Sequence, residues 1–128
     1  MFKRLILAAL IVTSSLQLTG CFALFVGAAA GAGGIIWAKG KLQQDLNASL
    51  DRAHSAATAS LKKLELPVIV DRKDKLSGKL ESEYADGKHV WIDLDYVTKT
   101  MTKIEVRVGT LGDEQRSREI LNEVMRRL

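Results

Sequence analysis

Residues 76–110, LSGKLESEYADGKHVWIDLDYVTKTMTKIEVRVGT, contain three runs in which apolar and polar side chains alternate. A period of two is typical of strands with one buried and one exposed face. The runs are Leu76–Tyr84, His89–Val97 and Thr102–Thr110, and a shorter run at Pro67–Asp71 precedes them. We therefore predict a four-strand antiparallel meander. Its expected inward-facing residues are Leu76, Leu80, Tyr84, Val90, Ile92, Leu94, Tyr96, Ile104, Val106 and Val108.

The turn between the first two runs tests this assignment of alternate residues to the inward and outward faces. A two-residue turn at Asp86-Gly87 would set the inward Tyr84 opposite the outward His89. A three-residue loop over residues 85–87 keeps inward residues opposite each other, for example Ser82 and Val90. It also places the glycine where a bulge needs a positive φ angle. We therefore predict the three-residue loop.

Two amphipathic helices are predicted to flank the strands. The first has an apolar stripe at spacings of three and four that ends before Pro67, namely Leu42, Leu46, Leu50, Ala53, Ala57, Leu61 and Leu64. The second begins after Asp113, a candidate N-cap, and its apolar face holds Ile120, Leu121, Val124 and Leu128. The predicted fold class is α+β. It is a two-layer sandwich over residues 41–128, with a long N-terminal helix, a four-strand antiparallel meander and a C-terminal helix.

Residues 1–20 have the layout of a secretory signal peptide. Lys3 and Arg4 precede a mostly apolar stretch, Leu5–Leu16, that is short for a membrane span. The chain's single cysteine follows at once, and Leu18-Thr19-Gly20-Cys21 resembles the bacterial lipobox. In that motif a peptidase cuts before the cysteine, whose sulfur carries the lipid. We predict cleavage between Gly20 and Cys21, and a palmitate-containing anchor on Cys21.

Residues 21–40 are predicted to be a membrane-proximal segment that is rich in glycine and alanine. Phe22–Ala38 has no charged residue, and Gly27 and Gly31 have the spacing that permits close helix approach in membranes. A flexible tether and an apolar segment packed on the domain remain as alternatives. A different topology would leave Leu5–Gly20 uncleaved as half of a helical hairpin. The domain would then lie in the cytoplasm.

The charge distribution argues against a nucleic-acid partner. The formal net charge of the whole chain is +4, but residues 41–128 hold 16 basic and 15 acidic side chains. Most of the excess charge therefore belongs to the targeting region. One cysteine excludes an intrachain disulfide, and two histidines with one cysteine are too few for a usual zinc site. No cofactor is predicted.

One strand carries the most informative cluster of polar residues. His89, Trp91, Asp93 and Asp95 share its outward face. A tryptophan there exposes apolar surface, so we predict a contact surface. The carboxylates are too few and too spread along the strand for a cation cage, so no metal site is predicted. The alternative is a solvated face whose charges pair with Lys79, Lys103 and Arg107 on neighbouring strands.

Two further features match no catalytic pattern. His54 lies beside the apolar stripe of the first helix, and we expect it to be satisfied by local hydrogen bonds. The glycines of Val108–Asp113 have the spacing of a phosphate loop but lack its Lys-Ser/Thr pair. We expect a simple strand-to-helix connection there. No catalytic residue is predicted.

The whole layout resembles a family of small bacterial lipoproteins whose domain has no known function. The features that carry this resemblance are the lipobox at Cys21, the run Gly27–Gly34, Leu50-Asp51-Arg52, Leu76-Ser77-Gly78-Lys79, and residues 106–113, VRVGTLGD. The resemblance implies an envelope lipoprotein with an α+β domain, and it implies no catalytic residues.

These observations predict a lipid-anchored, periplasm-facing protein that acts as a non-catalytic binding or structural module. Its expected partners are the membrane and, as a second candidate, an envelope protein. Phe22 follows the anchor cysteine where enteric-type bacteria use Asp for inner-membrane retention, which favours the outer membrane. The alternatives are a periplasmic enzyme or a lipid carrier that uses the face of His89, Trp91, Asp93 and Asp95.

Overall fold

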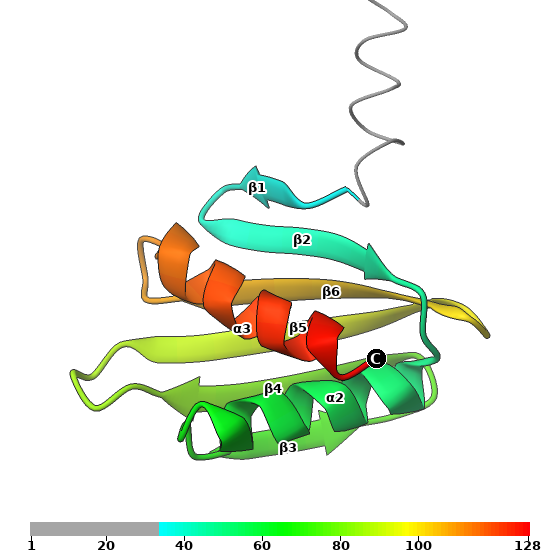
Figure 1. The fold of residues 1–128 in the computed structure, drawn as a ribbon, viewed down its shortest axis with the longest axis horizontal. Helices are drawn as coiled ribbons and strands as arrows, with labels where there is room; N and C mark the ends of the chain where they lie inside the picture. The colour runs from blue at the N-terminus through cyan, green and yellow to red at the C-terminus, as the bar shows by residue number, and fades with distance from the viewer. Residues whose placement is uncertain (1–33) are drawn as a thin grey trace, which may run out of the picture. The chain divides into compact units, whose positions relative to one another are not determined.

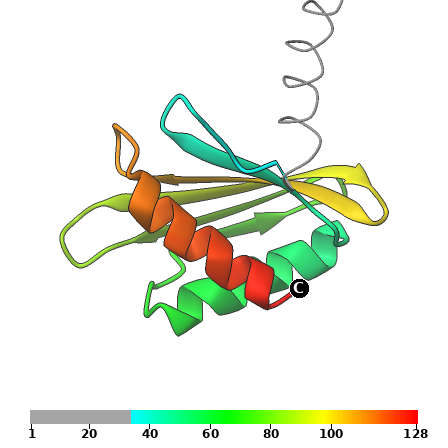
Figure 2. The ribbon, with the colours of Figure 1, turned by 45° about the horizontal axis from the view of Figure 1, so that its top comes forward.

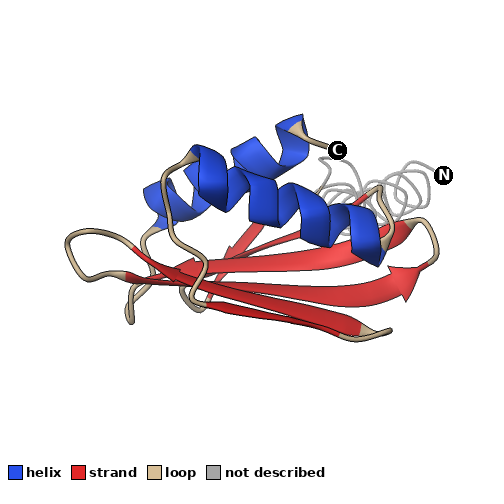
Figure 3. Cartoon of the chain, turned by 90° about the horizontal axis from the view of Figure 1, so that it is seen from below, coloured by secondary structure: helices blue, strands red, loops and turns tan. Residues whose placement is uncertain are grey.

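The computed structural model describes residues 34–128, in which two helices lie on one face of an antiparallel sheet (Figure 1, Figure 3). The sheet has six strands in the order β1-β2-β6-β5-β4-β3. The α+β class is confirmed. The strands are β1 (Ile36–Ala38), β2 (Lys41–Leu46), β3 (Val70–Lys73), β4 (Ser77–Glu83), β5 (His89–Thr98) and β6 (Met101–Val108). The helices are α2 (Leu50–Lys63) and α3 (Glu114–Arg126).

The predicted long N-terminal helix was wrong, and so was the four-strand sheet. Residues 41–46 form strand β2, which pairs with β6, and α2 begins only at Leu50. Leu42 and Leu46 are four residues apart, a spacing that suits both one helix face and alternate positions of a strand. Gln44 is buried between them in the strand, and because this inward residue is polar, the sequence does not alternate between apolar and polar side chains here.

The folded unit begins at Ile35, inside the stretch that we assigned to the membrane-proximal segment. Ile36–Ala38 pairs with β2 as an edge strand, and Trp37 packs partly against the core. The predicted signal peptide, Gly20 and Cys21 lie outside the described residues. Within residues 34–128, no helix has the length and apolar character needed to cross a bilayer.

The core lies between the sheet and the two helices. Even-numbered side chains of β4, β5 and β6 form its floor, and Ala53, Ala56 and Ala57 let α2 approach it closely. Leu76 and Tyr96 are also even-numbered and were predicted to face inward, but both are exposed at one end of the sheet. The fully buried hydrophobic strand residues are Leu42, Leu80, Val90, Ile92, Leu94, Ile104, Val106 and Val108.

Local predictions with a specific turn or cap were confirmed. Ser82 pairs with Val90 across the three-residue loop, and Gly87 has a φ of +90°. The Asp113 carboxylate caps α3 by accepting a hydrogen bond from the Arg116 N–H at 3.1 Å. The strand expected at Pro67–Asp71 starts later, at Val70.

Candidate binding surface on the open sheet face

The side of the sheet away from the helices is not covered by any described helix (Figure 3). Odd-numbered side chains of β2, β4, β5 and β6 project there, because successive side chains alternate between the two faces of a sheet. We call this surface the open face. Its central residues are Lys41, Gln43, Lys79, Glu81, His89, Trp91, Asp93, Lys103, Glu105 and Arg107.

Trp91 lies at the centre of the open face. Its cross-strand neighbours are Glu81 on β4 and Arg107 on β6. The guanidinium carbon of Arg107 is 5.5 Å from the indole centroid, and the His89 ring is 4.5 Å away at an angle of 50°. These contacts leave Trp91 half-buried. Its indole is therefore fixed by cation–π and aromatic contacts while part of it stays open to solvent.

His89 is hydrogen-bonded away from the aspartates of its own strand. Its Nε2 lies 3.1 Å from Oε1 of Glu81. Asp93 is four residues further along the strand, which is roughly 13 Å, and Asp95 is more distant and exposed. The structure therefore places these residues on one strand but does not bring His89 and either aspartate into contact.

Glu105 organises the half of the open face that adjoins β2. It accepts a hydrogen bond from Gln43 Nε2 at 3.1 Å and forms ion pairs with Lys41 at 3.8 Å and Lys103 at 3.2 Å. Our sequence analysis missed the roles of Lys41 and Gln43 because it predicted a helix from Leu42 onward in place of strand β2. Only the pairing of β2 with β6 brings them beside Glu105.

Asp93 is the carboxylate of this face with a raised pKa. Partial burial is the main cause, and the Lys79 ammonium, 3.9 Å away, opposes it while Glu105 adds to it. A shallow hollow of about 190 Å³ lies here, lined by Lys41, Lys79, Trp91, Asp93, Glu105 and Arg107. A flat ring beside three cations and two carboxylates suits a polar ligand or peptide that carries charges of both signs.

The remaining candidate residues lie elsewhere. His54 Nε2 lies 2.6 Å from Oδ1 of Asp71 on strand β3. Its partner is therefore 17 residues away and not the local one that we expected. Arg107 donates hydrogen bonds to the carbonyls of Gly109, at 3.3 Å, and Thr110. The loop before α3 thus turns carbonyls toward a cation, which fits a structural connection. Within the part of the chain that the structure describes, no three His, Cys, Asp or Glu side chains gather as metal ligands would.

Comparison with known proteins adds a family but no activity. None of the curated proteins compared matches this sequence. The profile of a family described as "Protein of unknown function (DUF3568)" matches residues 4–127. This range includes both helices and all six strands of the described domain. The expected membership of a family without known function is thus confirmed, while its lipoprotein character stays a prediction. The chain belongs to the DUF3568 family of proteins of unknown function.

Proposed function

We propose that this protein is a lipid-anchored lipoprotein of the bacterial cell envelope, whose domain faces the periplasm as a non-catalytic binding or structural module. The lipobox-like Leu18–Cys21 after a short apolar stretch supports the anchor. Acyl chains each add roughly 0.8 kcal/mol per buried CH₂, so more than one chain gives stable anchoring. Cys21 is the lipidated residue in this proposal, and the outer membrane is the favoured site.

The observation that carries the binding role is the position of Trp91 on the open face. Its indole is half-buried, held by Arg107 and His89, and flanked by a hollow with charges of both signs. Aromatic and arginine side chains in such settings contribute most of the binding energy at many protein interfaces. A partner that stacks on Trp91 would gain contact area without having to order the ring first.

The two alternative functions have less support. An enzyme that uses His89 with Asp93 would need those side chains in contact, whereas His89 bonds Glu81 and Asp93 faces Lys79. A lipid carrier would need a cavity between helices and sheet. Leu80, Ile92, Ile104 and Ile120 have no surface accessible to water, so no such cavity adjoins them.

Site-specific crosslinking in the full chain tests the binding role. A photoreactive amino acid replaces Trp91 or, as a control, the exposed Lys62 on α2. We expect a discrete envelope component to be captured from position 91 and not from position 62. In a separate pull-down with Trp91 retained, Arg107→Ala should reduce the recovery of the same component. Equal capture from both positions, or none from position 91, would contradict the binding role of this face.

Metabolic labelling tests the anchor independently. Cells that express the full chain should incorporate palmitate into the parent protein, and the Cys21→Ser variant should not. Globomycin, which inhibits processing at a lipobox, should make the precursor accumulate. Equal labelling of parent and variant, or processing that ignores the inhibitor, would contradict lipidation at Cys21.

A further inference from the structure

Several elements meet at one end of the sheet. The turn between β3 and β4 lies there, as does the hairpin between β5 and β6, because Ser77 pairs with Asp95 and Thr98 with Met101 (Figure 2). β2 ends at the same place and leads into α2. β1 begins opposite Gln43, in the middle of β2, and runs away from this end. We call this the entry end, because the chain enters α2 there.

The entry end exposes three large apolar side chains. Leu76 is 67% exposed, and Tyr96 and Val97 are 40% and 46% exposed. The first two are joined by a hydrogen bond in which the Tyr96 N–H donates to the Leu76 carbonyl at 2.8 Å. Exposed apolar residues that gather at one place, unlike single scattered ones, mark a surface that contacts another apolar phase or partner.

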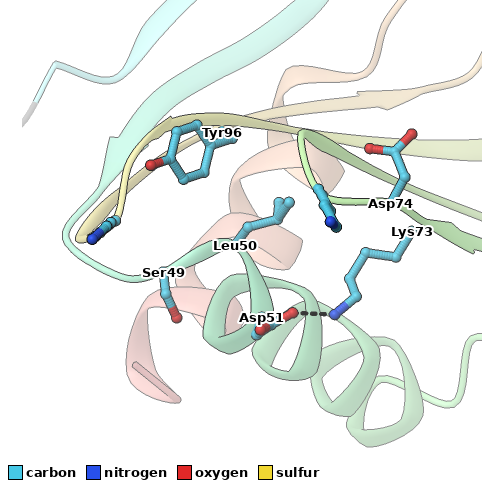
Figure 4. A pocket seen from close by; sticks show the side chains of 8 residues that line it. Ser49, Leu50, Asp51, Lys73, Asp74 and Tyr96 are labelled. Atoms are coloured by element: carbon cyan, nitrogen blue, oxygen red, sulfur yellow. Dashed lines mark hydrogen bonds and ion pairs between the residues drawn. The ribbon is translucent and has the colours of Figure 1, made fainter.

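Lysines line a hollow beside Tyr96, one of these apolar residues. An open hollow of about 560 Å³ at the N-terminus of α2 is lined in part by Lys73, Lys75, Lys99 and Tyr96 (Figure 4). Its acidic side chains are Asp51, which pairs with Lys73, and Asp74, whose carboxylate accepts the N–H groups of the following turn at 2.8 Å, so the three lysines outnumber them. Lys75 and Lys99 are exposed and form no ion pair with any residue between 34 and 128.

We propose that the entry end docks on a membrane surface that contains anionic phospholipid. Lys75 and Lys99 would contact the headgroups, and Leu76, Tyr96 and Val97 would enter the interface. Lysine, tyrosine and aliphatic side chains together suit the membrane–water interface. The aliphatic part of a lysine lies in apolar surroundings there, while its ammonium group stays hydrated.

The proposal rests on the lipid anchor proposed above, which holds the domain near the bilayer. Thirteen residues lie between Cys21 and Ile35, so the chain between them spans at most roughly 50 Å. The chain therefore keeps the entry end within reach of the bilayer. Leu111, at the opposite end of the sheet beyond β6, is 95% exposed, and Lys88, which lines the same hollow, pairs with Asp113.

Probe depth in vesicles tests the docking. The full chain, purified in its lipidated form, carries a spin label at Leu76→Cys or, as the matched control, at Leu111→Cys. It is reconstituted in vesicles of phosphatidylcholine alone or with 30% phosphatidylglycerol. We expect the label at 76 to be exposed to lipid-soluble oxygen and shielded from an aqueous relaxant only in the anionic vesicles. The label at 111 should stay in water in both.

Charge neutralisation tests the role of the lysines. The Lys75→Gln/Lys99→Gln variant should lower the docked-to-undocked ratio at position 76 roughly 30-fold, about fivefold for each lysine near an anionic surface. Lys62→Gln/Lys63→Gln removes the same charge from the other end of α2 and should leave that ratio unchanged. Circular dichroism of both variants verifies that they are folded.

The outcomes separate this proposal from the anchor. If the protein floats with both kinds of vesicle but the label at 76 stays in water, or if both lysine pairs have equal effects, docking by the entry end is overturned. If it floats with neither kind, the anchor itself fails, and the docking that rests on it fails with it.

Discussion

Gly40 and Gly112 bring the β1–β2 turn and the β6–α3 loop into backbone contact. A Cβ atom on Gly112 would lie 2.5 Å from both the Cα and the carbonyl oxygen of Gly40, and Gly112 has a φ of +84°. Gly112 is therefore restricted to glycine both by its positive φ angle and by the close backbone of Gly40. Our sequence analysis predicted a simple strand-to-helix connection here, but it could not find the contact, because the contact depends on strand β2 lying beside β6.

We expect Gly112→Ala to lower the free energy of unfolding by about 2–4 kcal/mol, from a strained positive φ and a backbone clash together. Gly87→Ala is the matched control. Its φ is +90°, but the nearest atom is 4.0 Å from the added carbon, so only the conformational part applies, about 1–2 kcal/mol. Urea denaturation measures both. An equal loss in the two variants would contradict the close approach of the two loops.

At the scale of elements, the predictions that succeeded rest on local patterns. Alternation over ten or fewer residues predicted β4, β5 and β6, and an aspartate before an amphipathic run predicted the cap of α3. The same alternation put His89, Trp91 and Asp93 on one face. Strand β2 was not predicted because its residues fit both the helical and the strand period. Strand β1 was not predicted because three residues in an apolar segment carry no pattern of their own.

Strand β2 can be distinguished from the predicted helix by two neighbouring substitutions. Gln44 faces the core and is 7% exposed, so Gln44→Lys should destabilise the protein by about 3 kcal/mol or more through a buried charge. Gln43→Lys puts the same side chain opposite Glu105 on the open face and should change stability by about 0.5 kcal/mol or less. Thermal unfolding checks this. Equal effects would be the result expected of a helix with both residues outward.

The start of α3 is joined to the β4–β5 loop by a charge cluster. Arg116 forms an ion pair with Asp86 at 2.9 Å and lies 4.3 Å from the ring centroid of Tyr84. The pKa of Asp86 is lowered first by the Lys88 N–H and then by Arg116. The pKa of Asp113 is lowered first by the Arg116 N–H and then by the Lys88 side chain.

Acid should therefore weaken this junction. Both carboxyls have a lower pKa in the folded state than in the unfolded chain, so their stabilisation is present above pH ~4 and is lost as the pH falls below it. Asp86→Asn/Asp113→Asn should flatten the fall in Tm between pH 5 and pH 3. Asp93 has a raised pKa, so protonation favours its folded state, and Asp93→Asn should steepen the same fall. Calorimetry across this range checks both signs. If both variants changed the slope of Tm against pH in the same direction, these pKa shifts would be contradicted.

At the scale of the whole molecule, both helices cover one face of the sheet and leave the other to polar side chains around Trp91. The charged neighbours on this face were predictable as a set, because every second residue had to project there. Their pairing was not predictable, because two of the three partners of Glu105, Lys41 and Gln43, lie about sixty positions away in the chain. The same separation explains why the entry end and its lysines could be recognised only in the folded domain.

The central claim is that this domain is held in the envelope by a lipid on Cys21, and intact-mass spectrometry of the membrane-extracted protein tests it most directly. We predict a chain of residues 21–128 whose mass exceeds that of the polypeptide by the acyl chains on its N-terminal cysteine. The Cys21→Ser variant should be recovered uncut. A parent protein that retains residues 1–20 and an unmodified cysteine would contradict the claim.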